Sequence, residues 1–232
     1  VFSFTSFLAI SGLGIGVSSL IVVMSVMNGF EKELQDRILG VVPHAIIYSN
    51  DPISDYKSNI DSLKNNKDVL EAAPYISIQG LISSSTDSKG VAITGIDIDI
   101  ENNMSIIPDY IVYGSLEGLK EKNSIIIGSW LASSLGVFVG DSVSITTSDI
   151  RSSIIGSYPR SATLKVVGIF ELRAEIDQSL VLISHELAQK IKGFKNETSS
   201  IRIKTSDLFK ADLIAFNAAK SLNSSNNKYY SS

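Results

Sequence analysis

The first thirty residues of the chain contain no Asp, Glu, Lys, Arg or His. Within them, Phe7 to Met27 form a nearly continuous apolar run that only small polar residues interrupt. A bilayer core about 30 Å thick needs roughly 20 helical residues that rise about 1.5 Å each. A secretory signal has a shorter apolar core of about 7 to 15 residues. We therefore predict a membrane-spanning helix, with a signal peptide or the buried helix of a soluble protein as the alternatives.

Small residues recur within this apolar segment. Gly12 and Gly16 have the spacing of a G-x-x-x-G motif, and Ser11, Ser18 and Ser25 follow each other at intervals of seven residues. In lipid, small residues allow the backbone of another helix to approach closely. We predict that these five residues are helix-packing positions.

The helical pattern continues beyond the apolar segment. Charged residues begin at Glu31 and alternate with Leu34 and Ile38, until Gly40 and Pro43 end the pattern. Residues 1–42 are therefore predicted to form a transmembrane helix and a rigid stalk. Because the chain starts at Val rather than Met and ends without any stop signal, we expect it to be a fragment of a longer protein.

After the stalk, the pattern changes to short β-branched runs separated by short helical segments. A strand–helix–strand unit at each end brackets a strand-rich middle. This arrangement predicts an α+β domain made of residues 43–82 and 196–232, with an inserted β-rich subdomain at 83–195. We predict strands at 45–48, 69–81, 91–96, 124–127, 143–147, 164–170, 180–183 and 201–204, and helices at 53–65, 129–135, 185–191 and 208–222.

Charge and residue usage exclude several classes of function. The 24 acidic and 20 basic residues give a net charge of −4, and no cluster of Lys and Arg is present, which argues against nucleic acid as a partner. The absence of Cys excludes disulfides, thiolate metal sites and a Cys nucleophile. The chain has neither a G-x-S-x-G nucleophile elbow nor a phosphate-binding G-x-x-x-x-G-K-[ST] loop. It is therefore not expected to hydrolyse ATP by that route.

Few residues are candidates for metal binding or catalysis. His44 and His185 do not form a ligand-spaced pair. Residues 97–101 resemble the start of a calcium loop, but they lack its Gly and its terminal Glu, so we predict a solvated turn there. We predict no catalytic residue, no metal site and no cofactor.

The connection between the strands predicted at 143–147 and 164–170 is unusually long. Residues 148–163 read SDIRSSIIGSYPRSAT and carry apolar Ile154, Ile155 and Tyr158 beside Pro159. Long loops with apolar tips are usually either binding elements or disordered. The apolar content and the rigid Pro favour a formed hairpin that protrudes from the domain, with a flexible linker as the alternative.

Several stretches of the chain resemble the LolC/LolE-type transmembrane subunits of the bacterial lipoprotein-releasing ABC transporter. The resemblance implies a first transmembrane helix, a MacB-core-like periplasmic domain starting at about residue 31, and three later helices that this chain lacks. It also implies location in the bacterial inner membrane, a LolD-like ATPase that uses the ATP, a LolA-like periplasmic carrier, lipoprotein substrates and a second LolC/LolE-type subunit or a second copy. The stretches are GFEKELQDRILGVVPH at 29–44, ITGID at 93–97, IIIGSWLASSLGVFVGDSV at 125–143, KVVGIFE at 165–171 and EIDQSLVLI at 175–183.

The long connection is similar to the carrier-recruiting Hook loop of the LolC type, which the LolE type lacks. The Hook's Gly-x-x-Pro stretch matches Gly156 to Pro159, but Ala162 stands where the LolC of enteric bacteria has a basic residue. Because RILGVVPH is as similar to LolE as to LolC, a hybrid subunit present in two copies is also compatible with the sequence. The residues that the resemblance marks as the carrier-binding hook are Ile154, Ile155, Gly156, Ser157, Tyr158, Pro159 and Arg160.

Two other functions remain as alternatives. One is a MacB-type efflux subunit or an FtsX-type signalling subunit. The other is a membrane-tethered periplasmic enzyme, which a cleft with convergent titratable groups around His44 or His185 would support.

Overall fold

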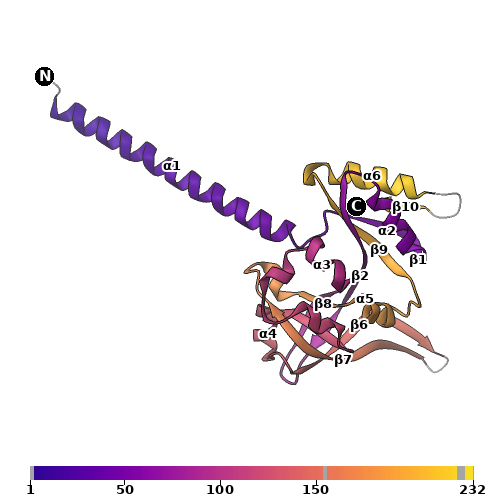
Figure 1. The fold of residues 1–232 in the computed structure, drawn as a ribbon. Helices are drawn as coiled ribbons and strands as arrows, with labels where there is room; N and C mark the ends of the chain where they lie inside the picture. Colours follow the sequence, from indigo (N-terminus) through magenta and orange to yellow (C-terminus); the bar gives the residue numbers. More distant parts are fainter. Residues whose placement is uncertain (1–2, 154–155, 224–227, 232) are drawn as a thin grey trace.

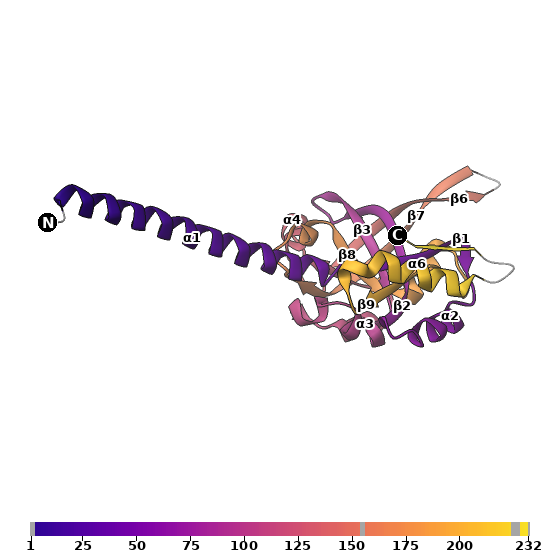
Figure 2. The same ribbon diagram turned by 90° about the horizontal axis from the view of Figure 1, so that it is seen from above.

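The computed structural model describes residues 3–153, 156–223 and 228–231. Helix α1, Phe4–Leu39, is one continuous rod of 36 residues that projects from the rest of the molecule (Figures 1 and 2). Its apolar stretch, Ser6–Lys32, has a mean hydropathy of 2.2, and none of it is buried in the molecule. In the described part of the chain, this is the one helix that is long and apolar enough to cross a membrane. The helix runs through the predicted stalk without interruption and ends just before Gly40.

The first part of the domain is an antiparallel sheet in the order β10-β1-β9-β2, with helices α2 and α6 packed against it. Buried positions on α6 recur at helical spacing, because Ala211, Ile214, Ala215, Ala218 and Ala219 face the sheet. All of these side chains except Ala211 form one hydrophobic core with the inward-facing residues of β1 and β9. The elements are β1 Ala45–Ile53, α2 Tyr56–Lys64, β2 Val69–Ser83, β9 Thr198–Thr205, α6 Ala211–Leu222 and β10 Tyr229–Ser231.

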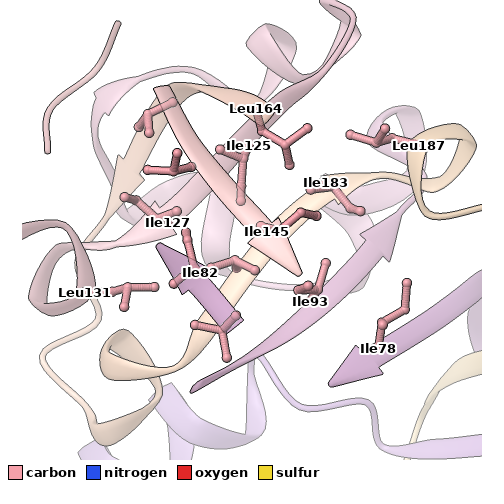
Figure 3. Close-up of a cluster of buried hydrophobic side chains, with 14 of the residues drawn as sticks. Ile78, Ile82, Ile93, Ile125, Ile127, Leu131, Ile145, Leu164, Ile183 and Leu187 are labelled. Carbon is pink, nitrogen blue, oxygen red and sulfur yellow. The ribbon is translucent and has the colours of Figure 1, made fainter. Parts of the chain in front are cut away.

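The second part of the domain continues the same sheet through β2. Residues Val69 to Tyr75 of β2 pair with β9, whereas Ile76 to Ser83 pair with β3. The path then runs β3-β8-β5-β7-β4, and β6 pairs with both β2 and β7. Isoleucines from several strands meet at the centre of a second core, as Figure 3 shows for Ile82, Ile93 and Ile127. The elements are β3 Ser88–Ile96, β5 Ser124–Gly128, α4 Ser129–Leu135, β6 Ser142–Ser153, β7 Gly156–Phe170, β8 Leu180–Ser184 and α5 His185–Lys192.

A third hydrophobic core lies where α1 joins the domain. It contains Val41, immediately after the helix, and the fully buried side chain of Phe170. Short elements that were not predicted surround this core: α3 Ile98–Met104, η1 Ile107–Tyr110, β4 Ile111–Gly114, η2 Leu116–Lys120 and η3 Glu175–Gln178. Elsewhere, the short helix η4 Leu208–Lys210 precedes α6 within the helix predicted at 208–222.

The solvated turn predicted at 97–101 is wrong. Asp97 begins helix α3, and its carboxylate accepts a hydrogen bond from the backbone N–H of Asp99 at 3.2 Å. This is an ordinary N-cap, which satisfies a backbone donor that the first helical turn leaves free. Glu101 is completely buried rather than solvated. A calcium loop and an acidic helix N-terminus can begin with the same residue types. The local sequence alone therefore did not distinguish the two structures.

Candidate functional site

The β6–β7 hairpin projects from the domain (Figures 1 and 2). The strands predicted to end at Thr147 and to resume at Leu164 both continue, and they pair as far as Ser153 and Gly156. Strand β2 covers the edge of β6 only up to Thr147, so the outer half of the hairpin is a two-stranded ribbon. Figures 1 and 2 show that this ribbon points away from the end of the domain that α1 enters.

Four of the residues marked as a hook lie in the outer part of this hairpin. Ile154 and Ile155 fall outside the described residues. Gly156, Ser157, Tyr158 and Pro159 belong to β7, where Pro159 is opposite Ile150 and Tyr158 is opposite Arg151. The structure thus places these four residues on one strand of the projecting ribbon.

Arg160 is oriented differently, toward the body of the domain. Its half-buried guanidinium donates a hydrogen bond through Nη1 to the carbonyl of Ile191, in the last turn of α5. A cation at this position interacts favourably with the partial negative charge of the helix C-terminus. Gly193 leaves room for it, since a Cβ there would lie 2.6 Å from Nη2 of Arg160. Arg160 therefore fastens the base of the hairpin to α5.

A second candidate site is the junction between α1 and the domain. The N–H of Ile106 donates to the carbonyl of Gly40 at 3.0 Å, and Val41 is buried in the third core. Nδ1 of His44 accepts a hydrogen bond from the N–H of Thr205 at 3.2 Å. Burial is the main cause that lowers the pKa of His44. The end of α1 is thus attached both to the η1 region and to the end of β9.

A buried ion pair connects these two attachment points. The carboxylate of Glu101 on α3 binds the guanidinium of Arg202 on β9, and both side chains are almost completely inaccessible. Ser105 donates its hydroxyl to Oε1 of Glu101 at 2.6 Å, and the ring of Tyr75 lies 5.7 Å from the Arg202 guanidinium carbon. No local sequence pattern indicated this pair. Its only sign was an Arg within the apolar strand at 201–204.

A cleft of about 830 Å³ lies between α2 and the elements α3, η2 and α5, and His185 is part of its lining. This histidine is 8% exposed, and its Nε2 lies 3.2 Å from the hydroxyl of Thr198. Its ring packs against Tyr56 at 5.6 Å between centroids. Burial lowers the pKa of His185 to about 4. The imidazole is therefore neutral at pH 7 and is used in packing, as is usual for a buried histidine.

Three other charged residues that line the cleft, Lys57, Asp97 and Glu186, act electrostatically on the pKa of His185, but less than burial does. Farther along the lining, Lys120 forms ion pairs with Asp99 at 3.1 Å and with Glu117 at 2.7 Å. Within residues 3–153, 156–223 and 228–231, no three His, Cys, Asp or Glu side chains are placed to hold a metal ion.

The pKa of His185 predicts how stability depends on pH. An unfolded imidazole titrates near 6.5 and the folded one near 4, so the unfolded chain binds the proton more tightly between these values. The stability that neutral His185 contributes is complete above pH 6.5, and up to about 3 kcal/mol is lost as the pH falls towards 4. Urea unfolding between pH 7 and pH 4 measures this loss, and His185→Gln should show a smaller one. An equal loss in the variant would contradict the assignment.

The small residues of α1 lie on two faces of the helix. At 100° per residue, Ser11, Ser18 and Ser25 share one face, while Gly12 and Gly16 lie roughly a third of a turn away. A Cβ at Gly12 or Gly16 would meet nothing within 4 Å, which leaves both positions open to another helix. A shallow groove runs along the serine face, and its lining is Ser11, Gly14, Ile15, Ser18, Ser19, Val22 and Val23.

Comparison with known proteins identifies the domain. The family described as MacB-like periplasmic core domain matches residues 6–219. Among solved structures, the periplasmic region of MacB from Actinobacillus actinomycetemcomitans is similar, with a TM-score of 0.52 and 13% sequence identity over 87% of this chain and 93% of that one. At this identity the likeness concerns the fold alone. The apolar helix and this domain together indicate a membrane protein with a periplasmic domain.

Two relatives with similar sequences are both named as transmembrane proteins of a lipoprotein-releasing system. The lipoprotein-releasing system transmembrane protein LolC of Neisseria meningitidis is 34% identical over 88% of this chain and 50% of its own length. The corresponding protein LolE of Haemophilus influenzae is 29% identical over 86% of this chain and 50% of its own length. This chain thus spans about half the length of these curated relatives. It belongs to the LolC/LolE family and carries a MacB-like periplasmic core domain.

Proposed function

We propose that this chain is part of the transmembrane and periplasmic subunit of an ABC transporter that extracts lipoproteins from the bacterial inner membrane and passes them to a LolA-like carrier. The observation that carries the proposal is the 34% identity to a lipoprotein-releasing LolC protein over 88% of the chain. The MacB-type alternative has weaker support, because the domain family that matches residues 6–219 describes the periplasmic core domain alone and the similar MacB structure is only 13% identical.

In this proposal, residues from about 31 onward lie in the periplasm. The ATP is used by a separate LolD-like ATPase, and this chain contributes no catalytic residue, metal or cofactor. A second LolC/LolE-type subunit, or a second copy of this one, packs against the small-residue faces of α1. The lipoprotein substrates reach the carrier through this assembly.

The direction of the β6–β7 hairpin supports a role in carrier binding. With α1 in the membrane, the ribbon points away from the bilayer and into the periplasm (Figure 1). We propose that Ile154 to Pro159 form the contact, while Arg160 holds the base of the hairpin in place through α5. In this arrangement, Arg160 acts on carrier affinity by positioning the ribbon.

The double variant Ile155→Ser/Pro159→Ser tests the hook. Burying one large apolar side chain in a partner contributes about 1.5 to 3 kcal/mol, so removing it should weaken carrier binding by about 10- to 150-fold. The measurement is the affinity of the detergent-solubilised chain for purified LolA-type carrier. Phe209→Ser is the matched control, because this exposed side chain belongs to η4 rather than to the hairpin. Undiminished binding by the double variant would rule out the hook assignment.

A further inference from the structure

Residues 129–140 expose an apolar surface without any charged side chain. The segment reads SWLASSLGVFVG and forms α4 and the turn that follows it. Trp130 is 64% exposed, Phe138 71% and Val139 43%. The other exposed residues are small and uncharged: Ser133, Ser134, Gly136 and Gly140. We refer to the exposed residues of this segment as the Trp130 patch.

The patch is held rigidly by the fold. Leu131 and Leu135 on the opposite face of α4 are buried in the second core, and Gly136 ends the helix at φ 65°. The backbone N–H of Phe138 donates to the carboxylate of Asp141 at 2.8 Å, and the N–H of Gly140 donates to the carbonyl of Val166 at 2.8 Å. An ordered backbone therefore keeps the aromatic side chains of the patch in solvent.

The patch lies at the end of the domain that α1 enters. Figures 1 and 2 both show α4 at this end. Contacts lead to the same conclusion, because α4 touches η3, and Ile176 of η3 packs on the third core, which also contains Val41. From Lys32, where the apolar stretch ends, to Leu39 the helix rises only about 10 Å. The patch is therefore on the side of the domain that faces the membrane surface.

We propose that the Trp130 patch contacts the bilayer and inserts its aromatic side chains at the level of the lipid headgroups. Tryptophan is enriched at this interface because its ring has both an apolar body and a polar N–H group. The exposed residues of the patch are uncharged and the adjacent, exposed Asp141 is acidic, so the contact rests on insertion of apolar side chains rather than on attraction to anionic headgroups. Such a contact would fix the tilt of the domain on its short stalk. It requires that α1 spans the bilayer, and it is independent of the hairpin and its carrier.

Intrinsic fluorescence tests this contact directly, because Trp130 is the only tryptophan of the sequence. The chain is reconstituted into phospholipid vesicles, with or without phosphatidylcholine brominated on the acyl chains close to the headgroup. Bromine quenches tryptophan only at short range. We expect about half of the Trp130 emission to be lost in the brominated vesicles if the ring lies at the interface.

Two variants make the experiment specific. In Trp130→Phe/Ser58→Trp, the only tryptophan is on the exposed side of α2, at the opposite end of the domain, and its emission should not change with bromine. Phe138→Asp places a charge in the patch and should reduce the quenching of Trp130, while circular dichroism confirms the fold. Equal Trp130 emission in both kinds of vesicle would overturn the proposal. Emission that depends on protein density but not on bromine would also overturn it, since a second copy would then cover the patch.

Discussion

Replacing Arg202 with methionine is expected to lower the free energy of unfolding by about 3 to 5 kcal/mol. The guanidinium and the carboxylate of Glu101 are both buried and bind each other, so the substitution leaves Glu101 as an unpaired charge in the interior. The remaining hydrogen bond from Ser105 compensates only a small part of that cost. Urea unfolding of the purified chain in detergent, followed by circular dichroism, measures the change.

Two further variants show whether the ion pair itself is responsible. Glu101→Leu/Arg202→Met removes both charges and should recover most of the stability that the single variant loses, because apolar replacements of a buried pair are often neutral. Lys120→Met removes a solvent-exposed cation from its two ion pairs and should leave the stability almost unchanged. If the double variant were as unstable as Arg202→Met, the loss would come from packing rather than from an unpaired charge.

Phe170→Ala is expected to cost about 3 to 5 kcal/mol of unfolding free energy. The ring is 0% exposed and lies in the same core as Val41, which attaches the domain to α1. The cavity left behind should also loosen the junction, so the amide of Ile106, which donates to Gly40, should exchange its hydrogen faster. Urea unfolding and hydrogen exchange measure the two effects.

Phe209→Ala is the matched control for this substitution. The same ring is removed, but at Phe209 it is 99% exposed, so the stability should change by less than about 0.5 kcal/mol. Equal losses for the two variants would contradict the assignment of Phe170 to a core. The pair therefore separates the effect of burial from the effect of the residue type.

Helices and strands that are determined by their own residues and immediate neighbours were predictable from the sequence. The absence of charge before Glu31 and the length of the apolar run indicate α1, because composition alone decides whether a helix is stable in lipid. Helix α4 has the predicted bounds, Ser129–Leu135, because Gly136 adopts the left-handed conformation that commonly ends a helix. Most strands of the sheet likewise follow from runs of β-branched residues bounded by turn residues.

The candidate sites depend on contacts that no local pattern contains. Whether Glu101 is solvated or buried is decided by Arg202, a residue 101 positions away that β9 places beside α3. In the sequence, Arg160 has the pattern of an exposed basic residue near a loop tip. In the structure, its guanidinium donates a hydrogen bond to the carbonyl of Ile191 in the last turn of α5. The Trp130 patch can face the membrane only because the fold places α4 at the end of the domain that α1 enters.

The sequence by itself determined that this chain has a membrane-spanning helix and a stalk, an α+β periplasmic domain and a resemblance to the LolC/LolE family, since composition, periodicity and motifs are local properties. The tertiary structure alone decided how α1 is fastened to the domain, where the long hairpin points and which charges are buried. These properties depend on which distant segments the chain path brings together, and burial, ion pairing and orientation are consequences of that proximity.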